Sequence, residues 1–271
     1  MSDAPRVAVV TGGNRGIGRA IALALARDGA RDGARDGARH GVAVAVSARS
    51  KDSLAETARE VEKAGAECLP VACDVRDEDS VREMGDAVLE RFGRVDAVVA
   101  NAGVAGPTRP MHEVSLAEWR DCVATDLDGV FLTFRQFIPA MIERRTGSLV
   151  AISSMTGKRA LHGRTPYAAA KMGLIGMVRT LAVELGPHGI RANTVCPGAV
   201  TGARIDDVVR RQAERQGISE DEARRQFSDA SPLRRLVDAE DVAAACVFLA
   251  SERGAAITGE DLNVSAGVVM Y

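Results

Sequence analysis

A short stretch near the middle of the chain, residues 154–171 (SMTGKRALHGRTPYAAAK), holds three side chains suited to moving a proton beside a carbonyl group. Tyr167 and Lys171 are four residues apart in a run that predicts a helix, so both side chains leave the same face about one turn apart. An ammonium group this close to a phenol stabilises the phenolate and makes the hydroxyl a better acid–base group. Ser154 follows the apolar run SLVAIS, where its hydroxyl could hold a substrate oxygen. Tyrosine and lysine at this spacing are common on helices, so the elements around them must decide the interpretation.

The start of the chain predicts a strand, a glycine-rich turn and an amphipathic helix. Residues 6–11 (RVAVVT) are followed by GGNRGIG and then by RAIALALARD. Such a turn lets the backbone approach a diphosphate closely, and the amides at the start of the helix donate to it. A purely structural turn is the alternative. The expected cofactor contacts here are Gly12, Asn14, Arg15, Gly16, Ile17 and Gly18.

The exit of the next predicted strand bears on the choice of nicotinamide cofactor. Residues 42–50 (VAVAVSARS) offer Ser47 and Arg49 where a carboxylate would bind the ribose hydroxyls and repel a 2′-phosphate. Arg15 is a second cation near that position, and guanidinium groups bind phosphate well. The sequence therefore predicts NADPH (NADP+), with NADH less favoured; the alternative is that Arg49 is simply solvated.

Between these elements the chain repeats a four-residue unit, RDGARDGARDGARHG, over residues 27–41. We interpret it as a tolerated local duplication in preference to a binding arm. Each glycine costs a helix interior roughly 1 kcal/mol relative to alanine, and little chain remains for a return to the next strand. We expect a frayed helix end and an exposed, mobile loop at the sheet edge opposite the ligand.

Strands and helices alternate along the rest of the chain, which predicts an α/β fold with a parallel, doubly wound sheet of about seven strands. The predicted strands are 6–11, 42–50, 67–73, 95–100, 147–153, 190–196 and 260–265, and the later helices are 52–64, 77–92, about 115–143, 166–185 and 239–250. Residues 203–230 are highly charged and predict a two-helix insertion, either a mobile substrate lid or a solvated pair without a role. No linker divides the chain, so residues 1–271 form one domain. Several strand ends carry further expected cofactor contacts: Asp74, Val75, Asn101, Ala102, Gly103, Pro197, Gly198 and Val200.

Composition excludes several functional classes. A net charge of -2 gives no reason to expect nucleic acid or an anionic membrane as a partner. The chain shows no leader and no apolar run long enough to span a bilayer. Its five cysteines are odd in number and lack metal-ligand spacing, so we expect reduced thiols, no metal site and a cytoplasmic protein.

Six ordered motifs, TGGNRGIG, CDV, NAG, Ser154, YAAAK and CPG, together resemble the short-chain dehydrogenase/reductase superfamily over the whole chain. The resemblance implies a Rossmann domain that binds NAD(P), a homotetramer, and catalytic roles for Ser154, Tyr167 and Lys171, the last two also touching the cofactor. Ser154 is preferred to Ser153 because it stands at the interval before Tyr167 that is common in the family. The segments GKRALHGRTPY and AAITGEDLNVSAGVVMY are similar to bacterial ketoacyl reductases and aromatic polyketide ketoreductases.

Two positions depart from the family pattern. Asp126 stands in TDLDG where the family has a fourth catalytic group, an asparagine. An ionised carboxylate cannot donate a hydrogen bond and would stabilise the Lys171 ammonium, so we expect weakened or retuned turnover. Gly202 stands where the family often has a threonine that meets the nicotinamide amide, and whether Thr201 replaces it is open.

The leading functional hypothesis is an NADPH-dependent carbonyl reductase in which hydride reaches a ketone held by Ser154 and protonated by Tyr167. The alternatives are an NAD(P)+-dependent secondary-alcohol dehydrogenase, and a catalytically weak NADPH-binding regulatory protein, motivated by Asp126. The expected partner is a small ketone or alcohol, which the sequence does not name. Its walls would come from the loops 104–114 and 155–165, with His162 either lining the substrate or lying on the surface, and from the segment 203–230.

Overall fold

The computed structural model describes residues 5–35 and 41–271, and its centre is one sheet of seven parallel strands in the order β3-β2-β1-β4-β5-β6-β7. This confirms the predicted doubly wound α/β fold. The strands are β1 (Arg6–Thr11), β2 (Val42–Ala48), β3 (Cys68–Ala72), β4 (Ala97–Ala100), β5 (Gly147–Ile152), β6 (Ile190–Pro197) and β7 (Asp261–Val264).

The strands are apolar because the sheet is covered on both faces. Residues 7–10 of β1 and the whole of β4 are buried, as expected for parallel strands that have helices above and below them. In register, Ala8 lies beside Ala97 of β4, and Thr11 lies beside Ser47 of β2. Strand β1 is therefore central, and its two neighbours continue the sheet in opposite directions.

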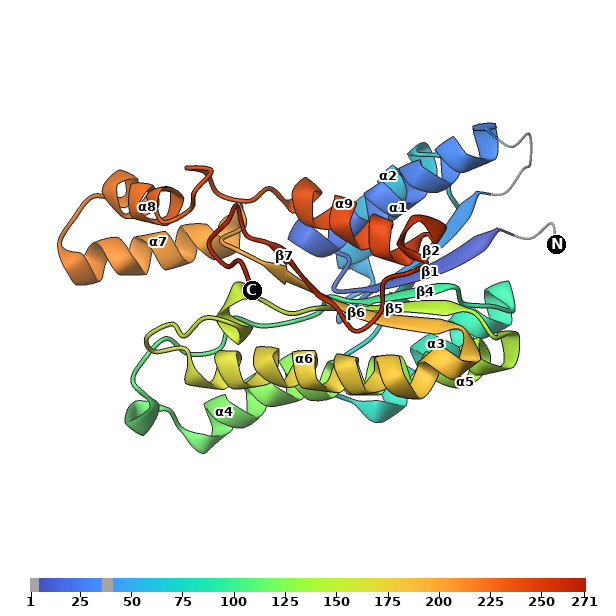
Figure 1. The fold of residues 1–271 in the computed structure, drawn as a ribbon, viewed down its shortest axis with the longest axis horizontal. Coiled ribbons are helices and arrows are strands. Elements are labelled where there is room, and N and C mark those ends of the chain that lie inside the picture. The colour runs from blue at the N-terminus through green and yellow to red at the C-terminus, as the bar shows by residue number, and fades with distance from the viewer. Residues whose placement is uncertain (1–4, 36–40) are drawn as a thin grey trace.

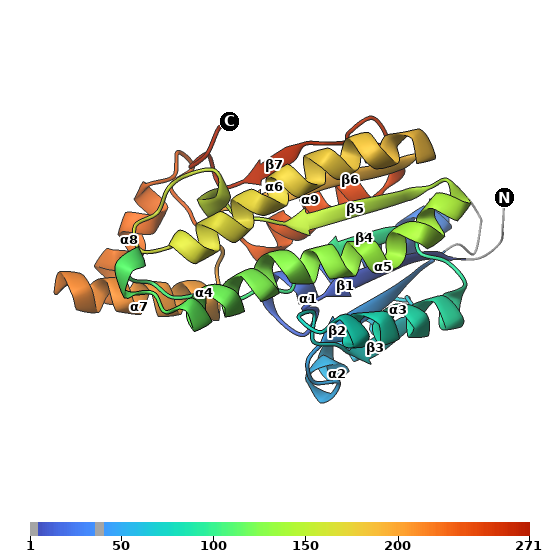
Figure 2. The ribbon, with the colours of Figure 1, turned by 90° about the horizontal axis from the view of Figure 1, so that it is seen from below.

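Helices form a layer on each side of the sheet (Figure 1). Helices α1, α2 and α9 cover one face, and α3, α5 and α6 cover the other, where Figure 2 shows them from below. The helices are α1 (Gly16–Arg35), α2 (Ala55–Lys63), α3 (Glu78–Phe92), α4 (Leu116–Val123), α5 (Gly129–Arg144), α6 (Thr165–Leu185), α7 (Ala203–Gln216), α8 (Glu220–Asp229) and α9 (Ala239–Ala250).

Helix α1 continues through the first units of the repeat as far as Arg35, further than the expected fraying allowed. Gly29 shows why this glycine suits the helix: a Cβ there would lie 2.6 Å from the backbone nitrogen of Val42, at the start of β2. Asp28 also forms an ion pair with Arg253, 2.8 Å away. Helix packing against β2 thus offsets the low helix propensity of glycine at this position. The remainder of the repeat, residues 36–40, lies outside the described residues.

The single helix predicted over 115–143 is two helices joined by a π-helical turn. Helix α4 begins at a capping box, in which Ser115 and Glu118 each bond the other's backbone. The turn, residues Ala124–Asp128, then widens the helix by one residue before α5 begins. Such turns are frequent at functional sites, and this one carries Asp126.

The charged segment 203–230 forms the predicted helix pair, α7 and α8, which extends beyond the carboxyl ends of the strands (Figure 1). Gly217 ends α7 with φ 65°, a left-handed conformation that glycine adopts at little cost. The pair has a small apolar core of its own around Val209 and Ala223.

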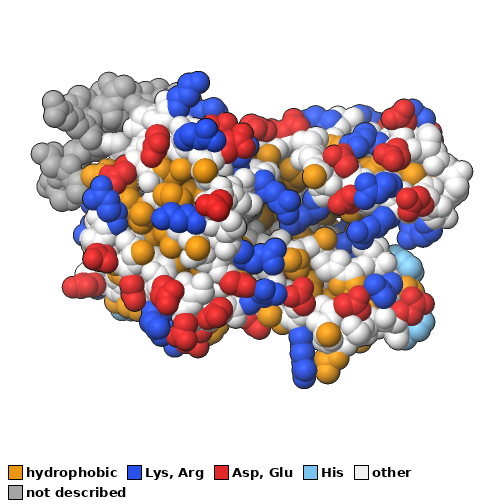
Figure 3. Space-filling model, turned by 180° about the vertical axis from the view of Figure 1, so that it is seen from behind, with side chains coloured by type: hydrophobic (Ala, Val, Ile, Leu, Met, Phe, Trp, Pro, Cys, Tyr) orange, Lys and Arg blue, Asp and Glu red, His pale blue; other side chains and the backbone are white. Residues whose placement is uncertain are grey.

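Basic and acidic side chains are interspersed on the face of the molecule drawn in Figure 3. Exposed ion pairs of the described residues include that of Arg82 with Asp79. No helix among the described residues is long and apolar enough to cross a membrane. Within residues 5–35 and 41–271, no three His, Cys, Asp or Glu side chains are grouped so that they could hold a metal ion.

Asp96 joins the two central strands at their amino ends, and its removal tests how strongly. Its carboxylate accepts from the Val7 backbone nitrogen at 2.8 Å and from two nitrogens of Arg94 at 2.5 and 2.9 Å. Asp96→Ala should lower the free energy of unfolding by about 1–3 kcal/mol, because it leaves the buried Val7 amide without its acceptor. Equilibrium urea unfolding followed by circular dichroism measures the change.

The matched control is Asp79→Ala, which breaks the exposed ion pair with Arg82. Solvent screens that pair, so the free energy of unfolding should change far less. Equal losses in the two variants would contradict the role given to Asp96.

Candidate active site

The residues predicted to do chemistry or to contact the cofactor lie at the carboxyl ends of the strands. Gly12 follows β1, Asn101 follows β4, Ser154 follows β5 and Pro197 ends β6. In a doubly wound sheet, the ends of two strands that continue in opposite directions leave a crevice where ligands bind. Here the strand order reverses between β1 and β4.

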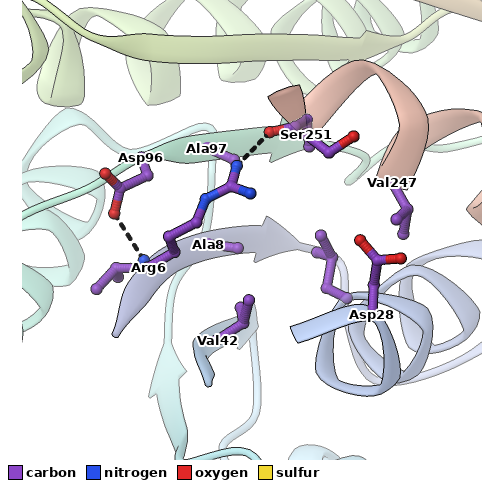
Figure 4. A pocket seen from close by; sticks show the side chains of 11 residues that line it. Arg6, Ala8, Asp28, Val42, Asp96, Ala97, Val247 and Ser251 are labelled. Atoms are coloured by element: carbon purple, nitrogen blue, oxygen red, sulfur yellow. Dashed lines mark hydrogen bonds between the residues drawn. The ribbon is translucent and has the colours of Figure 1, made fainter. Parts of the chain in front are cut away.

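A small pocket at the other end of the sheet, away from the carboxyl ends of the strands, is not a candidate for the active site (Figure 4). It lies against the first residues of the strands, such as Arg6 and Val42, and Arg6 donates to the carbonyl of Ala250 at 2.6 Å. Its volume is about 20 Å³, room for little more than one water molecule. It is part of the packing between α1, α9 and the sheet.

The glycine turn after β1 has the geometry that a diphosphate needs. Gly12 has φ 65° and Gly16 has φ 53°, both in the left-handed region. A Cβ at Gly18 would lie 2.2 Å from the carbonyl oxygen of Gly12, so only glycine lets α1 begin so close to the strand. Of the other residues predicted for this turn, Arg15 is exposed, and Asn14 and Ile17 are half-buried.

Asn101 fastens this turn to β4. Its side-chain amide donates to the carbonyl oxygens of Thr11 at 2.9 Å and Gly12 at 3.2 Å. In return, the Thr11 hydroxyl accepts from the backbone nitrogens of Asn101 at 3.0 Å and Ala102 at 3.1 Å. Sequence reasoning passed over Thr11, although a threonine at the last position of a central strand offers a hydroxyl at the sheet edge.

The exit of β2 carries an unusual hydroxyl. Ser47 is buried, and its Oγ has no hydrogen-bond partner among the described residues. Two positions later Arg49 is exposed. A buried hydroxyl normally has a partner, so the unpaired Oγ leaves a donor and an acceptor available at this edge.

The carboxylate of Asp74, after β3, is bound by Arg76, a residue that the sequence analysis did not single out. Arg76 donates to both of its carboxylate oxygens at 2.6 to 3.2 Å, and also reaches Asp121 at 2.9 Å. Hydrogen bonding to Arg76 lowers the pKa of the Asp74 carboxyl. The predicted contact between Asp74 and the cofactor would therefore have to share the carboxylate with Arg76. Val75 beside it is buried and packs against Gly129.

The structure distinguishes Ser154 from Ser153. The hydroxyl of Ser153 donates to the backbone oxygen of Lys171 at 2.8 Å, inside the protein. The Oγ of Ser154 accepts from the backbone nitrogen of Thr156 at 3.1 Å, which leaves its own proton free to donate. A Cβ at Gly157 would lie 2.8 Å from the Lys171 carbonyl carbon, so this turn rests directly on α6.

Lys171 is buried between two acceptors. Its Nζ lies 3.1 Å from Oδ1 of Asp126 and donates to the carbonyl oxygen of Ile152 at 2.9 Å. The same nitrogen lies 5.6 Å from the centre of the Tyr167 ring. An ammonium group has three N–H donors, so one remains beyond these two acceptors.

Asp126 has 0% exposure, so its charge must be compensated by partners inside the protein. Its Oδ1 also accepts from the backbone nitrogen of Val104 at 3.2 Å, and the Cys122 thiol donates to Oδ2 at 3.5 Å. Burial, with a further contribution from this carboxylate, raises the pKa of Cys122 to about 12, so the thiol stays protonated at neutral pH. A Cβ at Gly103 would lie 2.4 Å from Oδ1, which explains the glycine in the NAG turn.

A second cation, Arg164, lies beside Tyr167 and was not singled out from the sequence. Its guanidinium carbon is 4.7 Å from the centre of the Tyr167 ring, over the face of the ring. Its position three residues before the tyrosine, at the start of α6, is the signal that could have found it.

The CPG turn closes the site from β6. A Cβ at Gly198 would lie 2.9 Å from the Cα of Ser265, so the turn packs closely on the C-terminal segment. Val200 pairs with Val237. The Thr201 hydroxyl donates to Asp238 at 3.0 Å and thus already has a partner. His162 is exposed in its loop.

A pocket of about 240 Å³ opens between the helix pair α7–α8 and the segment after Ser154. Met155 and Thr156 line one wall, and Phe227 and Leu236 line the other. The helix pair thus lines a pocket next to Ser154, and its role as a substrate lid stays a prediction.

The family model described as enoyl-(acyl carrier protein) reductase matches residues 12–269. The cis-4-hydroxycyclohexanecarboxylate dehydrogenase of Sinomonas cyclohexanicum is 36% identical, covering 97% of this chain and 96% of its own. A variant of the actinorhodin polyketide ketoreductase, solved with NADPH, is 34% identical with a TM-score of 0.91, covering 100% and 99% of the two chains. The carveol dehydrogenase of Mycobacterium avium, solved with NAD, is 32% identical with a TM-score of 0.88, covering 98% of each.

The fold and the site thus define an oxidoreductase that acts on alcohol and ketone groups. The chain belongs to the short-chain dehydrogenase/reductase family, as its motifs indicate. Its solved relatives include one with NADPH and one with NAD, so family membership leaves the cofactor preference open.

Proposed function

We propose that the protein is an NADPH-dependent ketone reductase, with Tyr167 as the general acid. The observation that carries the proposal is the grouping of Tyr167, Lys171 and Ser154 at one end of the sheet. Lys171 is buried with one donor beyond its acceptors, and Ser154 has its hydroxyl proton free. A carbonyl oxygen between the two hydroxyls would meet both a hydrogen-bond donor and a proton source.

The residues at the carboxyl ends fit a dinucleotide. The turn from Gly12 to Gly18 needs glycine for its left-handed backbone and its close packing, and the buried Ser47 hydroxyl at the exit of β2 has no partner among the described residues. We propose that these residues, with the NAG and CPG turns, hold the cofactor. Asn14, Arg15, Ile17 and Val75 would line the same groove.

When bound, the reduced nicotinamide supplies a hydride to the substrate carbon. Ser154 donates to the carbonyl oxygen and fixes its position. Tyr167 gives its proton to the oxygen as negative charge develops there. Lys171 stabilises the resulting phenolate, and its remaining N–H would reach the ribose. In the reverse direction the same groups take a proton from a secondary alcohol, which is the nearest alternative activity.

Tyr167→Phe tests the mechanism, because it removes only the hydroxyl. Reduction of a panel of ketones, followed as NADPH absorbance at 340 nm, should fall by about a thousandfold or more, since general acid catalysis contributes about 10²–10⁴. The second tyrosine of the chain gives the control: Tyr271→Phe changes an exposed residue and should leave the rate unaltered. Unchanged reduction by the Tyr167→Phe protein would refute the mechanism.

Arg49 supports the preference for NADPH, because it is an exposed guanidinium two residues beyond the unpaired Ser47. Arg49→Ala should raise the KM for NADPH about tenfold or more, the loss expected for a charged hydrogen bond, while the KM for NADH stays within about twofold. Arg59→Ala, an exposed change on α2, is the control. A similar rise for both cofactors would argue against a 2′-phosphate contact.

The ion pair between Asp126 and Lys171 favours a second candidate, a catalytically weak protein that binds NADPH and regulates a partner. A buried carboxylate 3.1 Å from the ammonium competes with the phenolate for its charge. It also cannot donate a hydrogen bond to a water on the lysine side.

Asp126→Asn separates the two candidates. The reductase proposal expects steady turnover by the unaltered protein and a change of less than about tenfold in the variant, because an amide keeps an acceptor near Lys171. The control is Asp128→Asn, an exposed position of the same π-helical turn. Turnover near zero in the unaltered protein, with a large gain in Asp126→Asn alone, would favour the regulatory candidate.

We also propose a homotetramer built on the outer faces of α5 and α6. Phe131, Met172 and Val183 are exposed apolar residues of these helices, with 48%, 52% and 78% exposure. Exposed apolar surface of this kind favours association. Light scattering should give four times the chain mass of 28.5 kDa, and a monomer mass would refute the proposal.

A further inference from the structure

Arg164 is a buried cation without an anionic partner in the part of the chain that the structure describes. It has 8% exposure, and no carboxylate of the described residues forms an ion pair with it. Arginine is seldom buried unless it is paired. Burial lowers the pKa of its guanidinium, which is the sign of a charge short of solvent and counter-ions.

One edge of the guanidinium is held and the other is free. Nη1 donates to the hydroxyl of Thr108 at 3.0 Å. Nε is buried with no hydrogen-bond partner, and the described residues supply none for Nη2. These two nitrogens lie on one edge and form the fork that binds a carboxylate through two parallel hydrogen bonds.

The position of Arg164 is set by two loops that join above the site. The backbone nitrogen of Arg109 donates to the carbonyl oxygen of Gly163 at 3.0 Å, and Gly163 has φ 73°. A Cβ at Gly163 would lie 3.1 Å from that nitrogen, so a glycine is required at this crossing. The loops 104–114 and 155–165 therefore hold the arginine in place without a ligand.

Charges around Arg164 are unbalanced toward the positive. The one buried carboxylate of the site, Asp126, is already paired with Lys171. The nearby Arg204, on α7, repels Arg164 and donates to the carbonyl oxygen of Gly103 at 2.9 Å. Two guanidinium groups thus converge on the Tyr167 side of the site, one from the loop and one from the helix pair.

We propose that Arg164 binds a carboxylate of the substrate, so that the ketone reduced at Tyr167 is an oxocarboxylate. The inference rests on the proposed function, because it names the substrate class of the same site. The guanidinium lies against the Tyr167 ring, so an anion on its free edge and a carbonyl at the Tyr167 hydroxyl fit within one small molecule. Arg204 adds long-range attraction for the same anion.

The test compares each oxocarboxylate with its own methyl ester, which removes the charge and keeps the ketone. The pairs are 4-oxopentanoate, 5-oxohexanoate and 4-oxocyclohexanecarboxylate with their methyl esters, each reduced with NADPH. For the best pair, kcat/KM for the acid should exceed that for the ester by about tenfold or more, the effect of a charge-assisted hydrogen bond. Arg164→Gln should abolish this preference.

Two further variants separate binding from support of the fold. Arg59→Gln changes an exposed arginine on α2, away from the substrate loops, and should keep the preference for the acid. Arg164→Lys keeps the charge but loses the fork, so the preference should fall in part. A purely structural role, such as support of the Tyr167 ring, would lower the rates for acid and ester equally and leave their ratio unchanged. If Arg164→Gln does not fold, Arg164→Lys carries the test.

A binding measurement keeps the inference apart from the proposed function. Calorimetry with cyclohexanecarboxylate, against cyclohexanecarboxamide, is made on the protein with NADP+. Binding of the carboxylate alone, lost in Arg164→Gln, supports the site even if no ketone is reduced, an outcome that would overturn the reductase proposal only. Reduction of acids and esters at equal rates, an unchanged ratio in Arg164→Gln, or no carboxylate binding would overturn the role of Arg164.

Discussion

The hydrogen bonds from the Asn101 amide to the carbonyl oxygens of Thr11 and Gly12 join the ends of β4 and β1. The strand order of the sheet reverses between these two strands. Parallel strands cannot exchange bonds beyond their last residues, so a side chain must hold the ends together there. These bonds fix the glycine turn and the NAG turn to each other in the structure without a ligand. Preformed donors cost little reorganisation when a ligand binds.

The buried charges of the site also differ in how they are compensated within the protein. Lys171 is neutralised by Asp126 at 3.1 Å, deep inside the protein, whereas the partners of Arg164 within residues 5–35 and 41–271 are a hydroxyl and an aromatic face. An uncompensated charge is costly in such surroundings, and folding retains it only if other packing offsets that cost. The charge of Lys171 is therefore compensated by Asp126, and the charge of Arg164 is not compensated by a carboxylate of the described residues.

Much of the fold could be predicted from the sequence, because buried parallel strands are short apolar runs that alternate with helices. Local chemistry also predicted the glycine turn and the common face of Tyr167 and Lys171. The π-helical turn at Asp126 could not be predicted, since one extra residue barely disturbs the helical spacing of apolar side chains. Helix α1 extends beyond the end expected from the sequence because Gly29 packs against Val42. Helix propensity does not take such a tertiary contact into account.

The parts of the site that escaped prediction depend on pairs distant in the chain. Burial of Arg164 requires Thr108, from a loop 56 residues earlier. Asp74 is bound by Arg76, which also donates to Asp121, on a helix far along the chain. The choice of Ser154 over Ser153 relied on a family interval, and the structure supplies its physical reason, since the Ser153 hydroxyl is committed to Lys171.

That bond, together with the close contact of Gly157 on Lys171, has a consequence for how the protein can adapt. The turn after β5 and the first half of α6 behave as one solid block, so the spacing between the serine and tyrosine hydroxyls is set when the chain folds. The helix pair α7–α8 has an apolar core of its own, so substitutions within that core need not alter the spacing. New substrates can therefore be accommodated by rebuilding the walls while the chemical apparatus stays in place.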